Sequence, residues 1–335
     1  MPATRTRRLV AQAAAITTFG LASALLLPAA AQAAEAWPSK PIQLVGPFAA
    51  GGSTDVVARV FAEGLRQTLK QPVVVDNKAG AGGLMGTEAV AQATPDGYTV
   101  GMATVSTMTI NPLLYKRADG LGAKLTPVAQ LVTMPAVYMV HPKLGVKTFD
   151  EFMAKAKAEP GRISGAVPGR GALGPLMLAS FNETLKTDIL IVPYRGSGPA
   201  LNDALAGMVQ LMPDQLPSAM PLIKGGKLIP IVQAANGRSS DLPNVPTFKE
   251  LGYDGLNQLG ISWFGIVVPT GTPAPIVQRL QQAALEAVQL PGVKEQLRKM
   301  GATPTEMDQS QFAAEITAQT QRNKALLDKA GVKPE

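Results

Sequence analysis

Short apolar runs alternate with stretches of helical periodicity along the chain from residue 40 onward. Residues 42–45, 73–75 and 99–103 have the length and composition of buried strands. Between the first two, Val57, Phe61 and Leu65 belong to a set of apolar residues that recurs at helical spacing. This alternation predicts an α/β fold in which helices cover the faces of a mostly parallel sheet.

The second half of the chain repeats the pattern. Helices are expected from Pro175 and Pro199, and strands are expected at residues 163–167, 189–192, 209–212 and 228–232. A chain of 335 residues exceeds the usual size of one domain. We therefore expect a discontinuous first lobe, a second lobe and a cleft between them, with bounds at 34–140 plus 262–335 and at 141–261.

Two apolar stretches are expected to cross between the lobes, residues 126–140, which end near His141, and residues 261–268. Other residues carry the spacing and side-chain oxygens of helix starts. These are Thr148 with Glu151, Thr247 with Glu250, Thr272 before Pro273, and Ser53, Thr54 and Asp55.

The first 33 residues have the pattern of an export signal. Arg5, Arg7 and Arg8 precede an apolar run, and Ala31-Gln32-Ala33 provides a small-residue cleavage site. A membrane anchor is the alternative, but the purely apolar core at residues 21–27 is short and Pro28 follows it. We expect a cleaved signal peptide and a periplasmic protein.

The charge and cysteine content exclude several classes of function. Loss of the three signal arginines leaves 28 basic and 24 acidic residues, a net charge of about +4. The basic residues are scattered, and five Tyr and two Trp offer few stacking platforms, so nucleic-acid binding is not expected. Because the chain has no cysteine, disulfides, thiolate nucleophiles and Cys-ligated metals are excluded.

Two glycine-rich loops stand at expected strand-to-helix turns, at residues 47–55 and 79–83. Exposed backbone N–H groups and a helix dipole at such turns favour a carboxylate or a phosphate. The alternative is a tight connection in which glycine only relieves backbone strain. Because both loops fall in one lobe, an anion-binding function is favoured.

A third loop, Gly169-Arg170-Gly171-Ala172-Leu173-Gly174, has the spacing of a dinucleotide-binding turn. Asp188 follows too early to serve as the usual ribose-binding acid, so no cofactor is expected. The loop is interpreted as the anion-contacting loop of the second lobe, where Arg170 can pair with a ligand carboxylate. The alternative for Arg170 is an exposed, solvated side chain.

Catalysis is not indicated by the residues. The chain lacks a G-x-S-x-G elbow and a pair of histidines, and its single His141 is interpreted as structural. The runner-up interpretation is an exported α/β hydrolase that uses Ser53 beside Asp55, and the third is an interaction scaffold. The acidic residues Asp55, Asp96, Asp203 and Asp214 fall at turns and helix starts, where capping explains them without a metal.

The motifs, taken in order, resemble the tripartite tricarboxylate transporter receptor family, also called the Bug extracytoplasmic solute receptors. They cover most of the chain after the signal: WPSKPI from Trp37, the run from Pro47 to Asp55, the run from Pro72 to Gly83, PDGYT from Pro95, INPLLY from Ile110, VPYRGSGPAL from Val192, LPSA from Leu216 and SWFG from Ser262. The resemblance implies a two-lobed, Venus-flytrap periplasmic binding fold. It also implies a receptor that captures a small carboxylate-bearing molecule between its lobes for uptake or sensing.

The resemblance also implies the contacting residues. In the first lobe they are Phe48, Ala50, Gly51, Ser53, Thr54 and Asp55; in the second they are Gly169, Gly171, Tyr194, Gly196 and Asp214. The sequence departs from the family where relatives carry a hydroxyl-rich loop resembling G-S-x-G-x-G-T-x-x-H, since residues 166–175 read AVPGRGALGP. Leu84 also replaces a common asparagine. We expect Arg170 to compensate, and Val167, Ala172 and Leu173 to favour aromatic or aliphatic carboxylates over citrate-like polyacids.

The expected partners are a carboxylate ligand and, beyond it, the membrane subunits of a transporter. The receptor itself is expected to be a monomer that closes by hinge motion near His141 and Trp263.

Replacement of Arg170 by alanine tests its expected role. If the guanidinium pairs with a ligand carboxylate, Arg170→Ala weakens binding by more than about tenfold in calorimetry. Unchanged affinity would identify Arg170 as a solvated surface residue.

Overall fold

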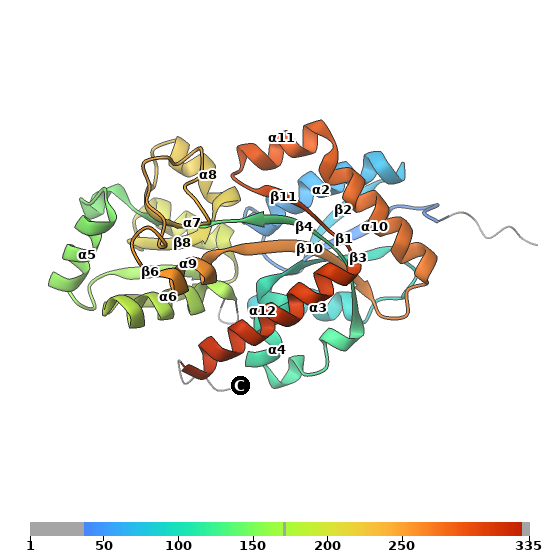
Figure 1. The fold of residues 1–335 in the computed structure, drawn as a ribbon, viewed down its shortest axis with the longest axis horizontal. Helices are drawn as coiled ribbons and strands as arrows, with labels where there is room; N and C mark the ends of the chain where they lie inside the picture. The colour runs from blue at the N-terminus through green and yellow to red at the C-terminus, as the bar shows by residue number, and fades with distance from the viewer. Residues whose placement is uncertain (1–36, 170–171, 330–335) are drawn as a thin grey trace, which may run out of the picture. The chain divides into compact units, whose positions relative to one another are not determined.

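The computed structural model describes residues 37–169 and 172–329, which contain two β-sheets (Figure 1). The predicted signal peptide, Arg170 and Gly171 lie outside these residues. From Lys40 onward the chain forms one compact unit, and the helices and strands named below belong to it.

The first lobe is built on a six-stranded sheet in the order β11-β4-β10-β3-β1-β2. Its strands are β1 (Ile42–Gly46), β2 (Val73–Asn77), β3 (Thr99–Thr104), β4 (Leu125–Met134), β10 (Ser262–Pro269) and β11 (Thr303–Met307). Its main helices are α2 (Ser53–Leu69), α3 (Leu84–Ala91), α4 (Asn111–Leu114), α10 (Ala274–Gln289), α11 (Pro291–Lys299) and α12 (Gln309–Lys329). Short 3₁₀ turns at Ala81–Gly83, Lys116–Ala118 and Gly122–Lys124, and a π-helical turn at Ser106–Ile110, complete it.

The second lobe is built on a five-stranded sheet in the order β7-β6-β8-β5-β9. Its strands are β5 (Ala136–Val140), β6 (Ser164–Pro168), β7 (Leu190–Tyr194), β8 (Leu211–Gln215) and β9 (Ile229–Ala234). Its helices are α5 (Phe149–Ala158), α6 (Leu173–Leu185), α7 (Ser197–Ala206), α8 (Leu216–Lys224) and α9 (Asp254–Gly260), with a 3₁₀ turn at Pro142–Leu144.

Both sheets are mixed, which corrects the expectation of mostly parallel pairing. Strand β1 pairs in parallel with β2 and β3, but β10 runs antiparallel to β3 and β4. In the second sheet, β6 is parallel to β7 and β8, whereas β5 is antiparallel to β8 and β9. The antiparallel pairs arise because β4 leads toward the second lobe while β10 returns from it.

The first crossing lies at Pro135 rather than near His141. Residues 126–140 form two strands, because β4 ends at Met134 in the first sheet and β5 begins at Ala136 in the second. Proline has no N–H to give to a ladder, which makes Pro135 a natural point to change sheets. The return crossing is at Ile261, immediately before β10.

The residues predicted to start helices have different roles in the structure. Thr148 and Glu151 form the full capping box of α5. Thr247 and Glu250 make the same reciprocal hydrogen bonds, but they close a turn rather than a helix. Thr272 does not cap α10, because its hydroxyl donates to the carbonyl of Pro269.

Aromatic contacts fill the core of each lobe. In the second lobe, Tyr138 stacks on Phe181 at 5.3 Å between ring centroids and meets Phe248 edge-on at 5.1 Å. In the first, Trp263 of β10 meets Phe312 of α12 edge-on at 5.0 Å, so the C-terminal helix rejoins the first lobe. These contacts fix the sheets beneath the loops described next.

Removal of the α5 cap should measurably destabilise the second lobe. Thr148 is exposed, so Thr148→Ala removes mainly the hydrogen bond to the Glu151 N–H and should lower the unfolding free energy by about 1 kcal/mol. Thr148→Ser retains the hydroxyl and is the control in urea unfolding. Equal losses for both variants would contradict the assignment of the effect to the cap.

Candidate functional site

The loop between β1 and α2 is braced by a buried acid. Gly52, not Ser53, occupies the N-cap of α2, and Asp55 in the first turn accepts a hydrogen bond from the Gly51 N–H at 3.0 Å. The other Asp55 oxygen forms an ion pair with Arg59 at 2.9 Å. Because Gly52 takes the cap position, Ser53 is free to point away from its own helix.

Ser53 reaches across to the second lobe. Its Oγ lies 2.7 Å from the Ser218 Oγ, accepts the Ser218 N–H at 3.1 Å and lies 3.2 Å from the carbonyl oxygen of Gln215. The Ser218 N–H belongs to the first turn of α8, where backbone donors have no partner within the helix. A hydroxyl of one lobe thus satisfies a helix start in the other.

Ser106 makes a second contact of the same kind. It lies in the π-helical turn after β3 and its Oγ accepts the N–H of Leu173, the first residue of α6, at 2.9 Å. The turn is held by reciprocal hydrogen bonds between Thr104 and Thr107. Ser106 therefore faces the second lobe from a fixed position.

Glycines allow the two lobes to approach this closely. A Cβ on Gly198, in the first turn of α7, would collide with the carbonyl oxygen of Ala50 in the other lobe. A Cβ on Gly196 would lie 3.1 Å from the Ala49 nitrogen, and one on Gly169 would lie 3.1 Å from the Gly82 Cα. The glycines of the predicted loops thus serve close packing between backbones.

Asp214 lies under the second-lobe wall at the end of β8. It is 1% exposed and accepts hydrogen bonds from Ser197 at 2.7 Å and from Ser218 at 2.5 Å. Burial raises the pKa of Asp214 to about 6, against the lowering effect of these two hydroxyls and of the Gln215 N–H. The acid therefore titrates within two pH units of neutrality.

These contacts surround a cavity of about 30 Å³. It is lined from the first lobe by Phe48, Gly52, Ser53, Thr54, Thr104, Ser106, Ser262 and Phe264, and from the second by Pro168, Ala172, Leu173, Gly174, Ser197 and Gln215. Hydroxyls and backbone amides supply its polar groups, and none of these described lining residues is charged. Such a lining suits recognition by hydrogen bonds rather than by ion pairs.

Comparisons with known proteins show which family the chain belongs to. Residues 57–332 match the family described as "Tripartite tricarboxylate transporter family receptor". The chain belongs to this family. The Bug protein BugT of Bordetella pertussis is 35% identical over 311 residues, which are 91% of this chain and 94% of BugT.

Solved structures show the fold of the receptor. The periplasmic binding protein BugD is 33% identical with a TM-score of 0.84, and covers 89% of this chain and all of its own. A Rhodopseudomonas palustris protein, Rpa4515, whose structure contains adipate, is 30% identical with a TM-score of 0.85 at the same coverage. The receptor thus has the two-lobed periplasmic-binding-protein fold and is a solute-binding protein of the periplasm rather than an enzyme.

The predicted contact residues differ in where they lie relative to the cavity. Phe48, Ser53 and Thr54 line the cavity, while Ala50 and Gly51 line a groove beside it with Ser218. Asp55, Gly169, Gly196 and Asp214 support the walls from behind or pack between lobes, and the Tyr194 hydroxyl donates to Asp203 on its own lobe. Arg170 and Gly171 lie outside the described residues.

The hydrolase alternative finds no support in these contacts. Asp55 is engaged by Gly51 and Arg59, and Ser53 contacts Ser218 and Gln215. Among the described residues, no carboxylate contacts the Ser53 hydroxyl directly to act as its base. His141, expected near the hinge, accepts the N–H of Lys143 just after β5.

Several residues that line the cavity were not predicted from the sequence. Thr104 ends β3 and Ser106 follows it, where the rule applied to the glycine loops would have found them. Ser197 and Ser218 stand inside the family motifs that begin at Val192 and Leu216. Ser262 and Phe264 are two residues apart in β10, so their side chains lie on the same face of the strand. Both line the cavity next to the return crossing.

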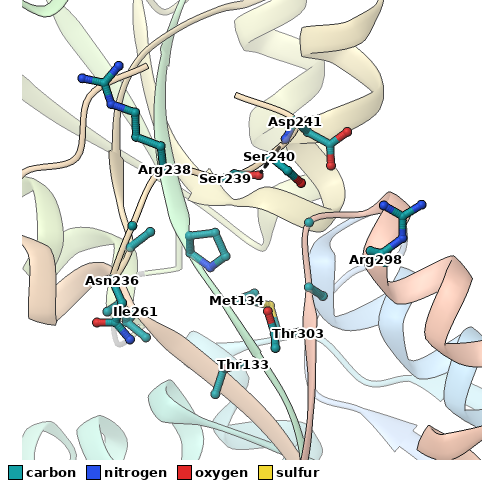
Figure 2. Close-up of a pocket in the computed structure, with 15 residues that line it drawn as sticks. Thr133, Met134, Asn236, Arg238, Ser239, Ser240, Asp241, Ile261, Arg298 and Thr303 are labelled. Carbon is teal, nitrogen blue, oxygen red and sulfur yellow. Dashed lines mark hydrogen bonds between the residues drawn. The ribbon is translucent and has the colours of Figure 1, made fainter. Parts of the chain in front are cut away.

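A wider groove of about 310 Å³ opens on the other side of the crossings (Figure 2). Pro135 and Ile261 line it, together with the loop after β9 and the turn before β11. Its charged side chains have partners of their own: Arg238 pairs with Glu250, Arg298 with Glu295, and Asp241 with Lys224. In Figure 2, Arg238 and Arg298 extend away from Met134, and the groove lies against both crossing points, Pro135 and Ile261.

Two features are absent from the part of the chain that the structure describes. Within residues 37–169 and 172–329, no helix is both long and apolar enough to cross a membrane. The same residues contain no cluster of three or more metal-binding side chains.

An added methyl group at Gly198 should hold the lobes apart. Gly198→Ala places a Cβ against the Ala50 carbonyl, and alanine is favoured over glycine in a helix, so the fold should stay within about 1 kcal/mol of wild type. Small-angle scattering should show a larger radius of gyration. Gly255→Ala, in α9 with no atom within 4 Å of the added carbon, is the control and should scatter like wild type.

Proposed function

We propose that the receptor captures a small aliphatic or aromatic carboxylate in the cavity between its lobes. The observation that carries this proposal is that hydroxyls from one lobe already occupy the acceptor positions at two helix starts of the other. A carboxylate oxygen is a stronger acceptor than a hydroxyl for these N–H groups. The adipate in the Rpa4515 structure supports this ligand class.

The lining suggests how such a ligand is held. A carboxylate takes the N–H groups of Leu173 and Ser218, and the hydroxyls of Ser53 and Ser106 turn to donate to it. Phe48, Phe264 and Leu173 provide apolar contact for the carbon chain. Ala172 and Leu173 offer no hydroxyl to a third carboxylate, which favours dicarboxylates over citrate-like acids.

Capture requires the lobes to move. A cavity of about 30 Å³ has room for a single water rather than a dicarboxylate, so a ligand enters when the Ser53 and Ser106 contacts open. Pro135 and Ile261 are the crossing points about which the lobes can turn. Ligand occupancy is thereby converted into a lobe angle that a partner can detect.

The proposed function also includes a cellular location and a partner. We place the mature protein in the periplasm after removal of residues 1–33, as a monomer that delivers its ligand to the membrane subunits of a tripartite transporter. No nucleic-acid partner is proposed, because the basic residues are scattered along the sequence rather than gathered in one run.

A ligand screen tests the proposed class. Adipate and other dicarboxylates should raise the melting temperature of the mature protein in a thermal-shift assay, because a ligand that binds the folded protein stabilises it by mass action. Citrate should shift it less, and nicotinamide dinucleotides not at all. A protein unmoved by every carboxylate, or moved by the dinucleotides, would overturn the proposal.

The contact between Ser106 and the start of α6 can be tested by mutation. Ser106→Ala should weaken adipate binding by about tenfold in calorimetry, because it removes one charge-assisted hydrogen bond. Ser180→Ala, on α6 away from the cavity lining, is the control and should bind like wild type.

A further inference from the structure

Asp214 controls which way the hydroxyls of the second-lobe wall point. One of its oxygens accepts the Ser197 hydroxyl and the other accepts the Ser218 hydroxyl, and all three residues are buried. Each serine has a single proton to donate. While Asp214 is ionised, both protons are held on its carboxylate, and the serines offer only lone pairs to the cleft.

This arrangement conflicts with a carboxylate ligand. A carboxylate also carries only lone pairs, so Ser197, which lines the cavity, repels it as long as its proton faces Asp214. If Asp214 carries a proton on the oxygen facing Ser197, it donates to the Ser197 Oγ. The Ser197 proton then turns into the cavity, while Ser218 still donates to the other Asp214 oxygen.

We propose that Asp214 is a positioning residue that takes up one proton from solvent when a carboxylate binds, and thereby turns Ser197 from an acceptor into a donor. This inference rests on the proposed function. One O–H bond forms on Asp214 as solvent gives up the proton, the Ser197 O–H rotates, and no bond between heavy atoms forms or breaks.

No other charge accounts for the behaviour of Asp214 among the described residues, which leave out Arg170. The elements that contact β8 are β5, β6, α6, α7 and α8, and α2 contacts α8. Their titratable groups, with Arg195 just before α7, are engaged elsewhere or exposed: Tyr138 with Met177, Asp203 with Tyr194, Lys224 with Asp241, Asp55 with Arg59, and Glu183 and Arg195 at the surface.

The direction of the pH effect follows from burial and charge. Burial already raises the pKa of Asp214 to about 6, and a ligand carboxylate nearby raises it further, since like charges disfavour ionisation. Between the pKa values of the free and the bound receptor, binding takes up a proton. Affinity therefore falls as pH rises above about 6, by at most about tenfold per pH unit for one proton, and levels off below it.

Calorimetry with adipate from pH 6 to 8, in pairs of buffers with different ionisation enthalpies, tests the inference. Adipate stays ionised over this range. Wild type should take up a fraction of a proton approaching one, and its affinity should fall with pH. Asp214→Asn should bind with a flat pH profile and no proton uptake, because its amide donates permanently to Ser197.

Two more variants keep the test decisive. Ser197→Ala removes the hydroxyl that responds to Asp214 and should lower both the slope and the proton uptake to what direct repulsion between the two carboxylates leaves, so it carries the test if Asp214→Asn fails to fold. A Ser197→Ala slope equal to that of wild type would contradict the role of the Ser197 hydroxyl. The control is Asp203→Asn, which changes an acid on α7, the helix that also carries Ser197. Asp203 accepts a hydrogen bond from the Tyr194 hydroxyl, and this variant should retain the wild-type dependence of affinity on pH.

The outcomes separate this inference from the proposed function. Adipate binding by wild type without proton uptake, or an Asp214→Asn slope equal to that of wild type, would overturn the role of Asp214 alone. Failure of wild type to bind any carboxylate at any pH would overturn the proposed function, and this inference with it.

Discussion

Two helix starts in the second lobe depend on hydroxyls that belong to the first. The N–H groups of Leu173 and Ser218 lie in first turns, where the helix provides no acceptor, and Ser106 and Ser53 supply one from across the cleft. Buried polar groups left without a partner are costly, so these contacts can open only if water or a ligand takes their place. The glycine packing and the brace of Asp55 serve to hold the walls at that distance.

The buried acid beneath the second-lobe wall is the other constraint. An ionised carboxylate with only hydroxyl and amide partners is poorly compensated, which is why Asp214 holds its proton more tightly than an exposed aspartate. An apolar residue in its place would leave the Ser197 and Ser218 hydroxyls without their acceptor. The wall therefore combines fixed donors on the backbone with adjustable ones on side chains.

The sequence predicted the α/β alternation, the two lobes and the loops that meet at the cleft, because each depends on local periodicity or turn chemistry. It did not predict where the first crossing falls, since residues 126–140 are apolar throughout and only strand pairing distinguishes β4 from β5. Asp55 braces Gly51, a role that the sequence did not reveal because it depends on the N-cap falling on Gly52, and its contact with a ligand stays a prediction. The role of Ser106 required its partner Leu173, 67 residues away, and no local signal links the two.

The groove behind Pro135 and Ile261 gives the crossing segments clearance. If side chains filled this groove, they would resist any rotation of the lobes that narrows it. Side chains there are separate from the residues that line the proposed ligand cavity, so a change in their size would act on closure rather than on ligand contacts. Evolution or design can therefore adjust how tightly a solute is retained by altering the back of the hinge, and leave the choice of solute to the front.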